Sequence, residues 1–156
     1  MWRKIAGVVF GYLAMAMLVI VSMIAAQWLL GRDFVLEKNS LVPSTKWCCL
    51  QLALGSISAT VGGIVAVKIG RQHLVVLWLA GLCFVFGLIN AAAIIFGPAL
   101  LLPAGQVPAD MTLAELSPYI KQPAWFAVIL AFLGPVGILI GGLVITGRIP
   151  SRREHS

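Results

Sequence analysis

The chain has 156 residues, of which 61% are hydrophobic and 10% charged, and its formal net charge at pH 7 is +6. Soluble domains are roughly 45–50% apolar and about 25% charged, so this composition excludes a soluble protein. Four membrane spans with their connections would occupy nearly the whole length. We therefore expect residues 1–156 to form a single integral membrane domain without a separate domain outside the bilayer.

Four long stretches contain no Asp, Glu, Lys or Arg. About 20 apolar residues, at a rise of about 1.5 Å per residue, cross a hydrocarbon core of about 30 Å. The predicted spans are 5–30, 47–67, 74–97 and 122–147. We expect an all-α membrane protein, a four-transmembrane-helix bundle.

The first span could be mistaken for a secretory signal, because Arg3 and Lys4 precede its apolar run. The run is longer than the 7–15 residues typical of a signal peptide, and residues 24–27 are a poor cleavage site. We expect it to be a retained helix.

The second span has a face of small residues when it is placed at 100° per residue. Gly55, Ala59, Gly62 and Gly63 fall on this face, and branched residues fill the opposite one. Lipid tails are as apolar as leucine, so membrane helices associate by close packing of small residues. The face predicts a helix contact.

The fourth span has a similar face, made of Ala127, Ala131, Gly134, Gly137 and Gly141. Gly137 and Gly141 have the Gly-x-x-x-Gly spacing that lets two backbones approach. We interpret both faces as packing surfaces within the bundle. The alternative is a seam between two copies of the chain.

The connection 98–121 is the one place outside the spans with room for extra structure. Thr112 and Glu115 have the spacing of a capping box, which predicts a short amphipathic turn over 113–117 on the outer surface.

Basic residues concentrate on one side of the predicted bundle, the side shared by the N-terminus, the 68–73 loop and the C-terminal tail. Its basic residues are Arg3, Lys4, Lys68, Arg71, Arg148, Arg152 and Arg153, and Glu154 is its acidic residue. The positive-inside rule makes this side cytoplasmic, so the bundle is N-in/C-in. The bias fits a bacterial inner membrane and contact with lipid head groups, and we expect no nucleic-acid partner.

Tryptophans fall near the predicted ends of the spans, where amphipathic rings anchor a protein at the membrane interface. They are Trp2, Trp28, Trp47, Trp78 and Trp125. We expect interfacial anchoring from each rather than stacking on a ligand.

The second and fourth spans are also alike in order. Trp47 precedes Gly62 by 15 residues, and Trp125 precedes Gly141 by 16. One hypothesis is that the chain holds two parallel two-helix repeats. The alternative is that tryptophan, glycine and a basic residue recur in this order in any inward-pointing membrane helix.

Three amides, Gln27, Gln51 and Asn90, share a level in the outer third of the membrane. Amides at this depth join helices by hydrogen bonds worth about 0.6 kcal/mol on average, and we favour that role. The functional alternative is a polar vestibule open to the outside, formed with Trp47.

The spans hold no ionisable group of the kind that marks proton relays, ion paths or catalysis. Both histidines, His73 and His155, lie outside the spans, so we expect no haem, other cofactor, metal site or catalytic centre. Cys83 lies roughly 13 Å in depth from the Cys48–Cys49 pair, beyond the roughly 7 Å Cα limit for a disulfide.

These observations favour a non-enzymatic scaffold or accessory subunit that acts through helix–helix contacts with itself or with another membrane protein. The alternative is a transporter or channel for a neutral or weakly polar small solute.

Overall fold

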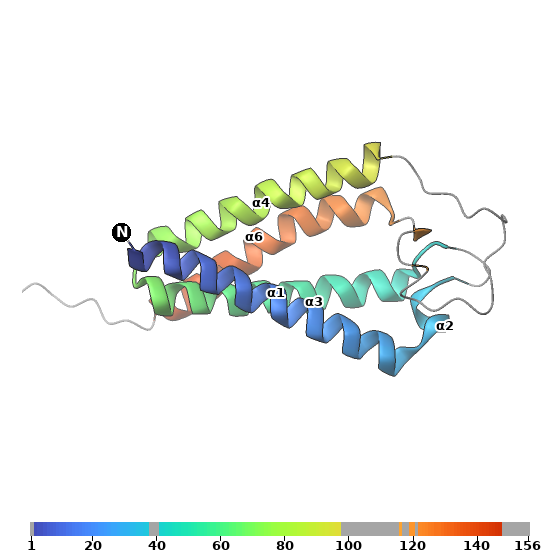
Figure 1. Ribbon diagram of the computed structural model, residues 1–156, viewed down its shortest axis with the longest axis horizontal. Coiled ribbons are helices and arrows are strands. Elements are labelled where there is room, and N and C mark those ends of the chain that lie inside the picture. The colour runs from blue at the N-terminus through green and yellow to red at the C-terminus, as the bar shows by residue number, and fades with distance from the viewer. Residues whose placement is uncertain (1, 38–40, 98–115, 117–118, 121, 148–156) are drawn as a thin grey trace, which may run out of the picture.

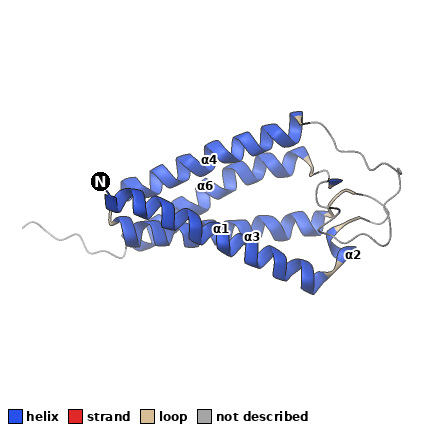
Figure 2. Cartoon of the chain, viewed as in Figure 1, coloured by secondary structure: helices blue, strands red, loops and turns tan. Residues whose placement is uncertain are grey.

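The computed structural model describes residues 2–37, 41–97, 116, 119–120 and 122–147, and it is all-helical (Figures 1 and 2). Its helices are α1 (Trp2–Leu30), α2 (Arg32–Val35), α3 (Thr45–Gly70), α4 (His73–Phe96) and α6 (Ala124–Thr146). Four of these, α1, α3, α4 and α6, are long and apolar enough to cross a membrane. The four long apolar helices predicted from sequence are therefore present as candidate membrane spans, and they indicate an integral membrane protein.

The four long helices pack in the order α1, α3, α6, α4. α3 lies between α1 and α6, and α6 lies between α3 and α4. Contacts between α1 and α4, the two edge helices, are sparse. Figure 1 shows these two edge helices close together near one end of the bundle and diverging toward the other.

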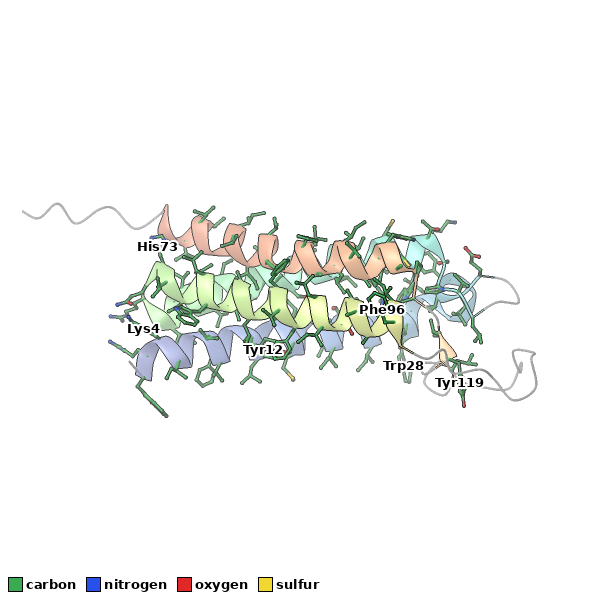
Figure 3. All side chains as sticks on the ribbon, turned by 90° about the horizontal axis from the view of Figure 1, so that it is seen from above. Lys4, Tyr12, Trp28, His73, Phe96 and Tyr119 are labelled. Atoms are coloured by element: carbon green, nitrogen blue, oxygen red, sulfur yellow. The ribbon has the colours of Figure 1, made fainter. Side chains whose placement is uncertain are left out.

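Labelled side chains distinguish the two ends of the bundle in Figure 3. Lys4 and His73 lie at one end, called here the basic end. Trp28, Phe96 and Tyr119 lie at the other, called the loop end, where the two longer connections are found.

Helix α3 has a defined start and stop. The Ser44 hydroxyl accepts a hydrogen bond from the Trp47 amide at 3.2 Å and donates one to the Phe34 carbonyl. At the other end Arg71 takes a left-handed conformation with φ 53°, and its amide donates to the Val67 carbonyl at 2.8 Å. These caps satisfy backbone groups that a helix end leaves unpaired.

Two apolar clusters hold the bundle together. The larger lies toward the basic end and joins α3, α4 and α6 through buried Ala66, Leu79 and Ile138. The smaller lies at the loop end, where Trp47 packs with Val35, Leu36 and Leu116.

Burial of Trp47 corrects one expectation. Its side chain is 3% exposed, because α2 and the residues after it fold back over the start of α3. It therefore cannot anchor at a lipid interface as predicted. The other four tryptophans are 45–88% exposed, as an interfacial position requires.

The predicted turn over 113–117 lies outside the described residues, apart from Leu116. Leu116 is fully buried in the loop-end cluster.

Candidate functional site

The small face of α3 serves two neighbours. On one side, a β-carbon added at Gly62 would lie 2.9 Å from the Met15 Cβ and 3.0 Å from the Gly11 carbonyl oxygen, both on α1. On the other side, a β-carbon at Gly63 would collide with the backbone of Ile138 on α6. The predicted packing face is thus divided between α1 and α6.

Helix α1 meets this face with glycines of its own. A β-carbon at Gly7 would lie 2.9 Å from the Gly70 Cα, and one at Gly11 would lie 2.8 Å from the Ala66 Cβ. Gly7 and Gly11 are four residues apart, which is the Gly-x-x-x-Gly spacing. The sequence analysis missed this pair, although the signal was present.

Helix α6 presents its small residues to two partners in the same way. A β-carbon at Gly137 would lie 2.9 Å from the Ala59 Cβ, and one at Gly141 would meet the Thr60 backbone. Ala131 instead faces α4, where a β-carbon at Gly87 would lie 2.9 Å from its Cα. Ala127 is also buried.

Two of the predicted packing residues line a space instead of a tight contact. A β-carbon at Gly134 would meet nothing within 4 Å, and one at Gly55 would meet only the Leu130 Cδ1 at 3.6 Å. Both glycines line a cavity of about 1010 Å³, called here the loop-end cavity. All four long helices contribute to its wall, and its size is at the upper end of ligand sites.

The loop-end cavity occupies one half of the bundle. It reaches from Leu41 and Ile120 in the loop-end connections to Ala59 and Cys83 in the helices. Cys83 is 96 − 83 = 13 residues from the end of α4, which corresponds to roughly 20 Å. Toward the basic end, the space between the helices is filled by the larger apolar cluster.

Two of the three predicted vestibule amides share this cavity. Gln51 and Asn90 both line it, whereas Gln27 and Trp47 are not part of its lining. Gln51 is 51 − 45 = 6 residues from the start of α3, and Asn90 is 96 − 90 = 6 residues from the end of α4. Both therefore lie roughly 9 Å along the helices from the loop end. Gln27, predicted at a similar depth, lies outside the lining of this cavity.

The described residues provide neither Gln51 nor Asn90 with a side-chain hydrogen bond, so the favoured role as interhelical links has no support there. Ser56, another lining residue, is already satisfied, since its hydroxyl donates to the Leu52 carbonyl at 2.7 Å. Gln51 and Asn90 thus line the cavity with amides that have no hydrogen-bond partner among the described residues.

None of the described residues that line the cavity is Asp, Glu, Lys, Arg or His, so the described part of the wall carries no formal charge. Over the described part of the chain, there is also no group of three or more His, Cys, Asp or Glu residues that could hold a metal ion. Cys48, Cys49 and Cys83 are free thiols, and Cys83 is the one that lines the cavity. No protein-family model, curated protein or solved structure matches this chain.

Proposed function

We propose that this chain is a non-enzymatic membrane protein that binds a neutral, weakly polar small molecule in the loop-end cavity, as part of a transport process. The supporting observation is a large cavity whose described lining residues carry no charge and include Gln51 and Asn90, two amides without a hydrogen-bond partner among the described residues.

The chemistry of the wall supports a neutral ligand. An amide without a protein partner offers both donors and an acceptor to a ligand that can pair with it. A charged ligand would lose its hydration and find no opposite charge on the described wall. Selectivity for uncharged molecules follows.

Packing in the other half of the bundle supports a pocket rather than an open channel. Gly11, Gly62 and Ala66 bring α1 and α3 into backbone contact, and Leu79 of α4 lies against Gly11. Passage across the membrane would need these contacts to separate. The proposal is therefore a binding site closed toward the basic end.

For topology, we propose N-in/C-in insertion in a bacterial inner membrane, which places the basic end in the cytoplasm. The excess of Lys and Arg on one side supports it. The cavity then opens in the outer half of the bilayer.

The two-helix repeat is also a proposal. Close packing of α1 on α3 and of α4 on α6 supports it, because each half then forms a hairpin. The two hairpins differ, however, in where their helices come closest. Gly11 of α1 meets α3 toward the basic end, whereas Gly87 of α4 meets α6 beside the cavity, and this difference argues against a repeat.

A second candidate function is an accessory subunit that acts through contacts with itself or another membrane protein. It is supported by α1, whose fully buried residues are Gly7 and Gly11 and whose large apolar side chains Phe10, Met17 and Ile20 are more than half exposed and can meet a partner or lipid. Crosslinking in native membranes tests it.

Cys83 offers a direct test of the binding proposal, because it lies inside the cavity. In a Cys48→Ala, Cys49→Ala background, we expect neutral N-ethylmaleimide to alkylate Cys83 in membranes. We expect an anionic sulfonated thiol reagent to react far more slowly. Gly134→Leu, which projects a side chain into the cavity, should slow N-ethylmaleimide. If Cys83 resists both reagents while the unfolded chain reacts fully, the cavity does not admit neutral solutes and the proposal fails.

A further inference from the structure

We propose that the ligand of the loop-end cavity is an uncharged glycerolipid of the diacylglycerol class, which reaches the cavity sideways from the bilayer through the gap between α1 and α4. This inference rests on the proposed function, because it names the class of molecule that the same cavity binds.

The divergence of the edge helices, together with exposed lining residues on both, supports access from the side. α1 and α4 approach where Gly11 faces Leu79 and diverge toward the loop end (Figure 1). Both helices contribute to the cavity wall along the diverging part. Phe86 of α4 lines the cavity and is 53% exposed on the bundle surface, and Tyr12 of α1 also lines the cavity and is 38% exposed. In a membrane, such exposed lining residues face lipid, so the cavity is continuous with the bilayer.

The route between α1 and α4 suits a lipid. At the loop end, apolar Leu41, Val42 and Ile120 line the cavity beside polar Tyr119 and Gln122, so the lining there is mixed. A lipid moving between α1 and α4 stays in an apolar surrounding throughout.

The depth of the cavity matches one leaflet. Its extent of roughly 20 Å along α4 is about half of the roughly 40–45 Å thickness of a bilayer with its head groups. A lipid chain lying along the helices therefore fits from the loop end to Cys83. The volume of about 1010 Å³ gives room for more than a small solute.

The depth of the two amides in the bilayer favours a lipid with an uncharged head group. Gln51 and Asn90 lie roughly 9 Å below the helix ends, while α4, at roughly 36 Å, exceeds the hydrocarbon core of about 30 Å by only a few ångström at each end. The amides thus sit within the hydrocarbon edge, deeper than a phosphate can go without a counter-charge. The head group of a diacylglycerol, a hydroxyl next to two ester groups, is uncharged and can lie at this depth. It offers the amides one hydrogen-bond donor and several acceptors.

The test uses the full chain in phosphatidylcholine vesicles with a diacylglycerol that carries a photoactivatable diazirine on one acyl chain. We expect photolabelling to concentrate on cavity-lining peptides of α1 and α4 and to be competed by unlabelled dioleoylglycerol. Asn90→Leu and Gln51→Leu should each lower the competed labelling about fivefold, as for loss of one net hydrogen bond. Gln27→Leu removes an amide at a similar level outside the cavity and should change nothing.

Three controls separate the outcomes. Each variant must keep the helical circular dichroism and elution volume of the parent chain, and Gly134→Leu should abolish competed labelling by filling the cavity. Diazirine-bearing phosphatidylcholine should label exposed helix faces without competition. Diacylglycerol labelling that follows the phosphatidylcholine pattern, or is not competed, overturns the lipid proposal. If Cys83 still reacts with N-ethylmaleimide in that case, the proposed function stands; if it does not, both fail.

Discussion

Gly137 lies directly against Ala59: a β-carbon added at Gly137 would stand 2.9 Å from the Ala59 Cβ and 3.0 Å from the Ser56 carbonyl oxygen. Helices α6 and α3 therefore touch backbone to backbone at this level, where a lipid-facing protein must obtain its stability from close packing. One turn away, Gly134 has open space. Substitutions at Gly137 and Gly134 therefore compare a tightly packed position with one that borders the cavity.

Gly137→Ala should lower the free energy of unfolding by about 1–3 kcal/mol, because the added methyl group forces α3 and α6 apart. Gly134→Ala should leave it unchanged or raise it by up to about 1 kcal/mol, since alanine is the better helix former and meets no neighbour. Reversible unfolding in mixed micelles, followed by circular dichroism, measures both. Equal losses in the two variants would mean that Gly134 is packed.

Gly11→Leu should separate α1 from α3 and destabilise the bundle by about 1–3 kcal/mol or more, because its β-carbon would already lie 2.8 Å from the Ala66 Cβ. The control is Gly81→Leu on α4, where an added β-carbon meets nothing within 4 Å and the residue is exposed. The same unfolding assay reads out both. A harmless Gly11→Leu would place α1 elsewhere on the bundle.

The sequence was sufficient for the spans because twenty uncharged apolar residues have few alternatives to a membrane helix. Predicted and observed boundaries agree within three residues at both ends of every span. The packing partners were harder to foresee. A helical wheel gives one small face to α3, but does not indicate that Gly62 meets α1 while Gly63 meets α6.

The cavity was beyond the sequence for a different reason. Its wall combines residues of all four long helices, and the divergence of α1 from α4 depends on how the helices cross, which the residue pattern of a single helix does not specify. Depth along the sequence placed Gln51 and Asn90 at one level correctly, but it also included Gln27, because depth carries no information on which way a side chain points.

Ser44→Ala should lower the free energy of unfolding by about 1 kcal/mol, the usual cost of losing an N-cap. The hydroxyl both accepts from the Trp47 amide and donates to the Phe34 carbonyl, so its loss frees the start of α3 and the chain that covers it. Quenching of Trp47 fluorescence by acrylamide should rise as the loop-end cluster loosens. Ser44→Thr keeps the hydroxyl and should restore the parent behaviour.

Asn90→Leu should separate stability from binding. Because the described residues give the amide no partner, its removal should leave the free energy of unfolding unchanged or raise it by about 1 kcal/mol. The same variant should lose competed lipid labelling. A clear loss of stability would instead show that Asn90 joins two helices, the role favoured from sequence.

The separation of α1 and α4 along the bundle tests the cavity most directly. Double electron–electron resonance between spin labels measures this separation, in a chain whose three native cysteines are replaced. The labels are attached at exposed positions. One pair is Ile5→Cys with Leu77→Cys near the basic end, and the other is Ile24→Cys with Ile89→Cys near the loop end. The splayed arrangement predicts a longer distance for the loop-end pair in vesicles. Equal distances would mean that α1 and α4 run parallel and close the gap, which would contradict the lateral cavity.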